Sequence, residues 1–423
     1  MAAEAADGAG AAGASSYGRG ARILSIGIAT TGLVTFAYFA LAARVLPEDG
    51  RDYGYVSTLW SILFITISVI YRPVEQLLSR SIADRRARGL HEDHPLRGPV
   101  LIQLAFAAVA VLVAFALRDT LEEKLGGATL FWILVGSALA YAASYFARGY
   151  CAGHGWFALY GGLVFFEAVA RVCFPLAVLA GVVDGVGWVA AGILAAPIAS
   201  LLVVPLALRS HAGRAPDAEA AQERRVAEGD GRFAAAVAGI GLGEQALLNA
   251  AVLLVPAGPQ AGIVFTAFLI TRVPLQLFQS VQTSLLPHLA GLEAGEGSVA
   301  FARAIRTTLL AVAAFAAAVT LGLLLLGPFT LELLFDKAGY SGLGLAAVGA
   351  GMGAHLAAAT LNQAALARGR ATAAAGLWLA AAAAFAAWML LEPIGDALVR
   401  AEVGYLAATS ALALALYALY RRP

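Results

Sequence analysis

Several charged side chains lie inside long apolar runs, where burying a charge is costly. Glu167 and Arg171 are four residues apart, so they share one face of a helix. Glu244 and Arg272 are equally distant from a predicted turn near Gly258, which gives them similar depth and would let them pair across a hairpin. A charge at the centre of a bilayer costs about 2.5–3.5 kcal/mol on insertion scales. These groups therefore predict either buried ion pairs or a polar cavity between helices.

Other polar side chains extend such faces at helical spacing. Arg272, Gln276 and Gln279 follow an i, i+4, i+7 pattern, and Tyr141 and Tyr145 belong to a second polar stripe. Small Ser and Thr side chains fit tight helix seams. Long Arg and Gln side chains fit a water-filled cleft better, so we expect these stripes to line one.

The composition explains why the runs are so apolar. Of 423 residues, 61% are apolar and 13% are charged, whereas soluble domains carry about 25% charged residues. The chain is therefore predicted to be an integral membrane protein, and the net charge of +1 gives no sign of a nucleic-acid partner. There is no phosphate-binding loop and no nucleophile–base pair, so we expect no enzyme activity, no catalytic residues, no metal and no cofactor.

Twelve apolar runs are long enough to be membrane-spanning helices, each of about 20 residues. A leader at residues 1–21 precedes them and is predicted to be disordered. The predicted spans are 23–43, 54–72, 98–117, 129–147, 158–181, 186–208, 233–256, 261–287, 304–327, 341–366, 371–391 and 402–420. The Gly-rich run 341–366 is the one most open to a break.

The distribution of Lys and Arg predicts the orientation of the chain. The two termini and the even connections hold 20 of these residues, and the odd connections hold 6. Because cytoplasmic loops are enriched in Lys and Arg, both termini are predicted to be cytoplasmic. The basic stretch 209–232 would be a cytoplasmic linker between a lobe at 22–208 and a lobe at 233–423.

A weak internal repeat supports two lobes. A shift of 207 positions places Leu78 on Leu285, Ile82 on Leu289 and Ala83 on Ala290. Two six-helix lobes that start on the same side of the membrane would be related by a pseudo-twofold axis along the membrane normal. The predicted fold class is thus an all-α membrane protein with twelve transmembrane helices in two six-helix lobes.

Local motifs add a family resemblance. The first span ends in Ala43-Arg44-Val45-Leu46-Pro47 and is followed by Tyr53-Gly54, which resembles the opening of polysaccharide-transporter flippases. Leu78-Ser79-Arg80 and Thr283 to Ala290 resemble the ends of the second and eighth helices of that family. The family belongs to the superfamily of multidrug, oligosaccharidyl-lipid and polysaccharide exporters.

The resemblance implies an alternating-access flippase that moves a lipid-linked oligosaccharide or polysaccharide precursor across a bacterial plasma membrane. Its implied partners are the lipid-linked glycan, the bilayer, and glycosyltransferases or a polymerase of the same pathway. Arginine would bind the diphosphate of such a cargo by charge and paired hydrogen bonds. The implied substrate-binding residues are Arg72, Arg171, Arg272, Gln276, Gln279, Tyr141 and Tyr145, and the implied ion-coupling residues are Glu244 and Glu167.

Two alternative functions remain open. One is a cation-coupled extruder of drugs or other small molecules from the same superfamily. The absence of an acidic residue between Ser25 and Ala43 counts against one branch of such extruders, and Glu244 keeps another open. The other alternative is a membrane scaffold for a glycan-synthesis complex, which would need no charged cleft.

Overall fold

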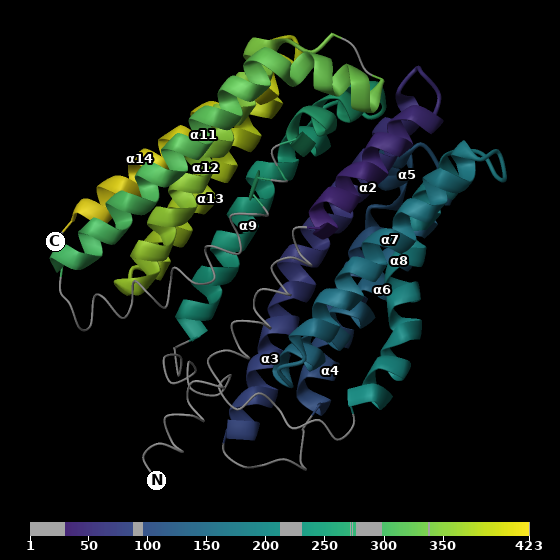
Figure 1. Ribbon diagram of the computed structural model, residues 1–423, viewed down its shortest axis with the longest axis horizontal. Coiled ribbons are helices and arrows are strands. Elements are labelled where there is room, and N and C mark those ends of the chain that lie inside the picture. Colours follow the sequence, from purple (N-terminus) through teal and green to yellow (C-terminus); the bar gives the residue numbers. More distant parts are fainter. Residues whose placement is uncertain are drawn as a thin grey trace, which may run out of the picture. The chain divides into compact units, whose positions relative to one another are not determined.

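The membrane-spanning helices agree with the twelve predicted runs. The computed structural model describes residues 30–87, 96–211, 231–270, 272, 274–275, 298–336 and 339–422. Throughout these residues the secondary structure is helical, with no strand (Figure 1). Nine helices are long and apolar enough to cross a membrane, and three shorter apolar helices are Thr30–Val45, Val186–Leu202 and Pro259–Ile270. Each coincides with one predicted run, so the all-α membrane fold class is confirmed.

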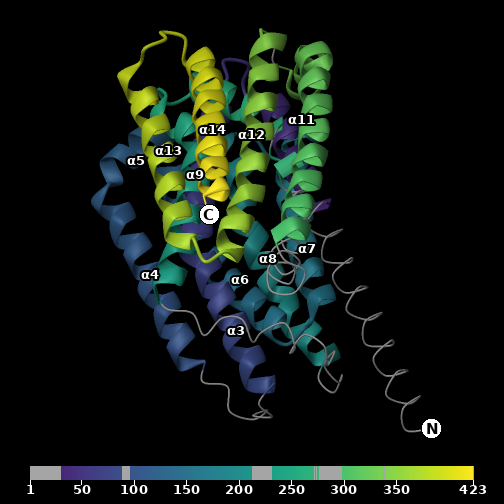
Figure 2. The same cartoon turned by 90° about the vertical axis from the view of Figure 1, so that its left-hand side faces the viewer.

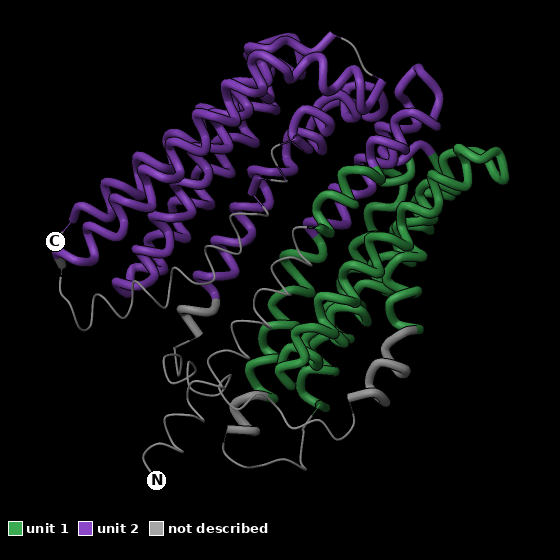
Figure 3. The backbone as a smooth tube through the Cα atoms, viewed as in Figure 1, with its two compact units in different colours: residues 1–38, 66–122, 127–229 green, residues 39–65, 123–126, 230–423 purple. Residues whose placement is uncertain are grey.

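The chain forms two compact units (Figure 3). The first comprises Met1–Tyr38, Thr66–Glu122 and Gly127–Gly229, and the second comprises Phe39–Ile65, Glu123–Gly126 and Asp230–Pro423. Residues 39–65 and 123–126 belong to the second unit. The lobes at 22–208 and 233–423 with a linker at 209–232 remain a prediction.

The helix of the second predicted span belongs to both units. It consists of α2 (Arg51–Thr66), a π-helical turn (Ile67–Tyr71) and α3 (Arg72–Ala87), and the unit boundary falls after Ile65. The backbone N–H of Arg72 bonds to the carbonyl of Ile67, five residues back. Pro73 follows and has no N–H to restore the regular ladder, which accounts for the wider turn at this point.

Unit 1 is organised around α6. Four of its helices are α3, α4 (Arg97–Ala116), α7 (Phe157–Leu179) and α8 (Val186–His211), and α6 (Ala128–Gly153) packs against all four. Two glycines four residues apart allow the close approach of α3. A Cβ at Gly149 would lie 2.8 Å from the carbonyl oxygen of Glu75, and one at Gly153 would lie 2.8 Å from Ile82. A short helix α5 (Arg118–Leu125) was not predicted.

Unit 2 contains α9 (Gly231–Leu254), α11 (Ser298–Phe335), α12 (Gly342–Ala367), α13 (Ala371–Leu391) and α14 (Ala397–Arg421). Here α12 packs against α11 and α14, and α13 packs against α9 and α14 (Figure 2). The Gly-rich run 341–366 is a continuous helix. Its glycines face its neighbours: Gly351 contacts Tyr405 of α14, and Gly349 contacts Thr320 of α11. Close packing thus replaces the side-chain contacts that these glycines lack.

Candidate functional site

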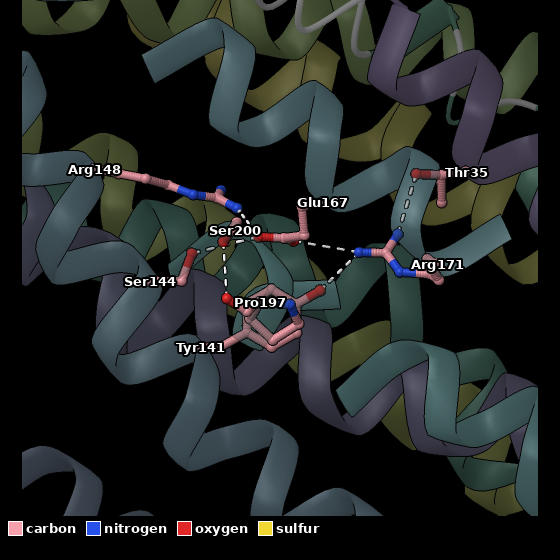
Figure 4. A network of polar contacts seen from close by, with 8 residues as sticks. All are labelled: Thr35, Tyr141, Ser144, Arg148, Glu167, Arg171, Pro197 and Ser200. Carbon is pink, nitrogen blue, oxygen red and sulfur yellow. Dashed lines mark hydrogen bonds and ion pairs between the residues drawn. The ribbon is translucent and has the colours of Figure 1, made fainter. Parts of the chain in front are cut away.

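A buried ion-pair network occupies the interior of unit 1 (Figure 4). Glu167 on α7 accepts hydrogen bonds from two guanidinium groups, that of Arg148 on α6 and that of Arg171 one turn along α7 at 3.3 Å. The hydroxyl of Ser144 also donates to Glu167 at 3.4 Å. Arg171 donates further to the hydroxyl of Tyr141 at 2.7 Å and to that of Thr35 at 3.3 Å. One carboxylate therefore serves two arginines.

Helical spacing positions these groups. Glu167 and Arg171 share a face of α7, as predicted, and Tyr141, Ser144 and Arg148 follow the i, i+3, i+7 spacing of one face of α6. Glu167, Arg171 and Arg148 are 4%, 3% and 6% exposed. Removal of such charges from water is tolerated when they pair and their remaining donors find acceptors. The network therefore joins α6 to α7 through buried ion pairs and hydrogen bonds.

A second acidic group borders this network. Glu75 on α3 is buried and accepts a hydrogen bond from Tyr160, and its carboxylate interacts electrostatically with Arg148. The guanidinium of Arg148 also lies 4.6 Å from the ring centre of Tyr145. Two carboxylates thus face two buried guanidinium groups, which balances the formal charge. Glu75 was not identified from the sequence, and the predicted span 129–147 ends one residue before Arg148, which lies inside α6.

Unit 2 contains a separate cluster of titratable side chains near the middle of its helices. Glu244 on α9 has a side chain 28% exposed, and its Oε1 lies 3.9 Å from Nε2 of His355 on α12, whose side chain is 1% exposed. Nδ1 of His355 lies 3.3 Å from the hydroxyl of Tyr405 on α14. The ring of Trp378 packs edge-on against His355 at 5.3 Å. A partly exposed carboxylate therefore stands in front of a buried imidazole.

The imidazole nitrogen that faces Glu244 is unsatisfied. Among the residues that the structure describes, Nε2 of His355 has no hydrogen-bond partner. A buried polar atom without a partner carries a free-energy cost of about 1–3 kcal/mol. A cation or a proton held between Glu244 and His355 would remove that cost. The sequence contained both residues, but their pairing across helices could not be deduced from spacing along one helix.

Arg272 lies close to this cluster but does not form the predicted pair with Glu244. Its guanidinium donates to the side-chain oxygen of Asn249 at 2.7 Å and to the carbonyl of Leu248 at 3.5 Å. It also lies over the rings of Phe64 and Phe265, at 5.5 and 5.3 Å. Within the described part of the chain, no carboxylate forms an ion pair with it. Aromatic faces and neutral oxygens hold this half-buried cation instead.

The remaining predicted site residues have mixed outcomes. Tyr141 is buried in the unit 1 network, Tyr145 stacks on Arg148, and Arg72 is exposed at the start of α3. Gln276 and Gln279 lie outside the described residues. Residues 283–290, which carry part of the predicted internal repeat, also lie outside them. The predicted residues thus divide between the two units, with Glu244 and Arg272 in unit 2.

Comparisons with solved structures identify the fold. No family model matches the sequence, and no curated protein matches it. A mutant of the Vibrio cholerae MATE transporter VcmN has a TM-score of 0.64 at 17% identity, over 97% of each chain. A multidrug resistance MATE transporter of the MOP superfamily, in an inward-facing conformation, has a TM-score of 0.68 at 12% identity, over 94% of this chain and 97% of that one.

A third similar structure is a MOP superfamily transporter from Pyrococcus furiosus, whose description reports a binding pocket of reverse polarity. Its TM-score is 0.66 at 14% identity, over 95% of this chain and 94% of that one. The three likenesses extend over nearly the whole of each chain. The chain therefore has the two-lobe helical fold of these membrane transporters.

Proposed function

We propose that this protein is an alternating-access transporter that exports small molecules in exchange for a cation, with Glu244 and His355 as the cation site. The observation that carries the proposal is the partly exposed carboxylate of Glu244 opposite the unsatisfied Nε2 of His355. Both residues lie near the middle of helices that cross the membrane. An ionisable group at that depth is a functional-site candidate by default.

The fold, and the pairing of the unit 1 arginines with a carboxylate, favour an extruder over a glycan flippase. One protein of the same fold is a multidrug resistance transporter. A flippase for a diphosphate-linked cargo needs guanidinium groups with free donors. Arg148 and Arg171 both pair with Glu167, which reduces the positive charge that unit 1 can offer to an anionic cargo.

The flippase of lipid-linked glycans is the second candidate, and Arg272 favours it. Its guanidinium is half-buried and forms hydrogen bonds only with neutral oxygens among the described residues. A diphosphate approaching it would gain a charge-assisted hydrogen bond. In this proposal Gln276 and Gln279 would continue the binding face along the same helix.

The experiment uses the full-length protein in liposomes loaded with ethidium, a cationic fluorescent drug, under an imposed proton or sodium gradient. We expect gradient-driven ethidium movement in the wild type and its loss to the level of empty liposomes in Glu244→Gln. Glu332→Gln, at an exposed acidic residue of α11, is the matched control and should transport like the wild type. Gradient-independent movement, or an unaffected Glu244→Gln variant, would contradict the proposal.

A parallel assay separates the two candidates. Liposomes that carry a polyprenyl-diphosphate oligosaccharide would be tested for movement of the glycan between leaflets. Glycan movement that is lost in Arg272→Gln and retained in Glu244→Gln would favour the flippase. Absence of both activities would leave the scaffold as the remaining function.

A further inference from the structure

A buried carboxylate lies at one end of unit 2, away from the Glu244 cluster. Glu402, in the second turn of α14, is 3% exposed. Both of its carboxylate oxygens press against Gly344 in the first turn of α12, where any side chain would overlap them. Among the residues that the structure describes, Oε1 of Glu402 has no hydrogen-bond partner. The glycine thus provides space for a carboxylate that nothing described there neutralises.

Neighbouring groups already have other partners. Ser341 caps α12 and accepts from the N–H of Gly344, so Glu402 does not serve as that cap. Asp396 caps α14 by accepting from Val399 at 2.9 Å. Arg400 donates to Glu392 at 3.2 Å and to the carbonyl of Ile394 at 2.8 Å. No described Lys or Arg is therefore paired with Glu402.

The groups that face Glu402 would all favour its neutral form or leave it unaffected. Asp396 repels a negative charge on Glu402 electrostatically. Tyr340, on the connection between α11 and α12, also interacts with it, and burial raises the pKa of Tyr340 so that its hydroxyl stays neutral. Glu392, which follows the end of α13, is paired with Arg400.

A half-open cavity of about 340 Å³ gives water a route to this place. It is lined by Tyr340, by Gln260 at the start of the helix Pro259–Ile270, and by Asp396 and Leu398 at the start of α14. Leu398 precedes Glu402 by one helical turn, and Tyr340 and Asp396 both interact with the carboxylate. The cavity therefore extends to the immediate neighbours of Glu402.

We propose that Glu402 is a proton-binding site that is loaded from this cavity. An ion without a partner in a low-dielectric interior costs several kcal/mol, and a carboxylate removes that cost by taking up a proton. A hydronium ion in the cavity transfers its proton to a carboxylate oxygen, which leaves a neutral carboxyl group and one water molecule. The chemistry needs no metal and no further reactant.

The site also gives the proposed cation coupling an entry point, and this step rests on the proposed function. Tyr405 follows Glu402 by three residues, on the same side of α14. Its hydroxyl contacts His355, which in turn faces Glu244. Titratable side chains thus extend along the packed faces of α12 and α14 from the cavity end towards Glu244.

Carbodiimide labelling tests the proton site directly. Dicyclohexylcarbodiimide reacts with protonated carboxyl groups in apolar surroundings, and mass spectrometry of peptides locates the adduct. In the purified full-length protein we expect the adduct on Glu402 in acidic buffer and its loss to background in alkaline buffer. Glu402→Gln should lack the adduct, and Glu332→Gln should leave it unchanged. The wild type alone decides the question if a variant fails to fold.

Two results would overturn the proposal. Absence of the adduct at every pH would mean that Glu402 remains ionised and paired. Protection by sodium at constant acidic pH would mean that the site holds a metal ion. The transport step is tested separately: Glu402→Gln should slow proton-driven ethidium movement. Normal labelling in a protein without transport would retain the proton site and reject the proposed function.

Discussion

At the scale of single residues, Glu167 controls the charge balance of unit 1. It pairs with both Arg148 and Arg171, so Glu167→Gln leaves two buried guanidinium groups without their shared carboxylate. Breaking a buried pair in this way costs about 3–5 kcal/mol. We expect a large fall in the melting temperature of the detergent-purified protein. Adding Arg148→Gln to this variant should recover part of the loss, because it removes one of the stranded charges.

The double-mutant cycle provides the check. Stability losses that simply add would show that the two side chains act independently. Additive stability losses would contradict the proposal that Glu167 and Arg148 act as one network. Glu167→Gln keeps the size of the side chain, whereas Arg148→Gln shortens it by two atoms; the cycle separates the pairwise coupling from the packing that Arg148→Gln loses by itself.

Single-helix spacing predicted one contact of this network and could not predict the others. Glu167 and Arg171 are four residues apart on one helix, and their pairing follows from helical geometry. Arg148 and Glu75 approach from other helices, and nothing in local spacing specifies which helices are neighbours. The same limit applies to His355, which faces Glu244 from a helix more than 100 residues away. Each of these pairings depends on which helices pack against one another in the folded protein.

At the scale of elements, apolar length predicted the helices well and their ends poorly. The predicted span 129–147 ends once the helix is long enough to cross a bilayer, whereas α6 continues to Gly153. The ion pair with Glu167 and close packing on α3 allow that extension. Arg148 is consequently an interior residue of α6.

The glycines of α6 give a prediction for helix packing. A Cβ at Gly149 would lie 2.8 Å from the carbonyl oxygen of Glu75, and backbone cannot yield as a flexible side chain can. Overpacking of this kind costs about 1–3 kcal/mol, so Gly149→Ala should lower the melting temperature. Gly162→Ala on α7 is the matched control, because no atom lies within 4 Å of the added group. Equal stability of the two variants would rule out tight α3–α6 packing.

At the scale of the whole molecule, composition was enough to predict a membrane protein, and the run lengths were enough to predict twelve spans. The function could not be derived to the same depth. Proteins of one fold host different functions, and cargo is determined by the side chains of the site. Glu244 and Arg272 point to different cargoes, one through cation coupling and the other through affinity for an anion.

The orientation of the chain is the last prediction. The termini and even connections hold 20 basic residues against 6 at the odd connections, which predicts a cytoplasmic C-terminus. In a background without Cys151 and Cys173, single Asp119→Cys and Arg422→Cys variants place thiols at exposed positions of the connection before α6 and of the C-terminus. A membrane-impermeant maleimide applied to intact cells should label the Asp119→Cys variant alone. In inverted membrane vesicles it should label the Arg422→Cys variant alone. The cavity beside Glu402 lies at the end of unit 2 that is formed by odd connections, which the expected labelling places at the outer face. The opposite pattern would place this cavity at the cytoplasmic face. Protons would then enter that site from the cytoplasm.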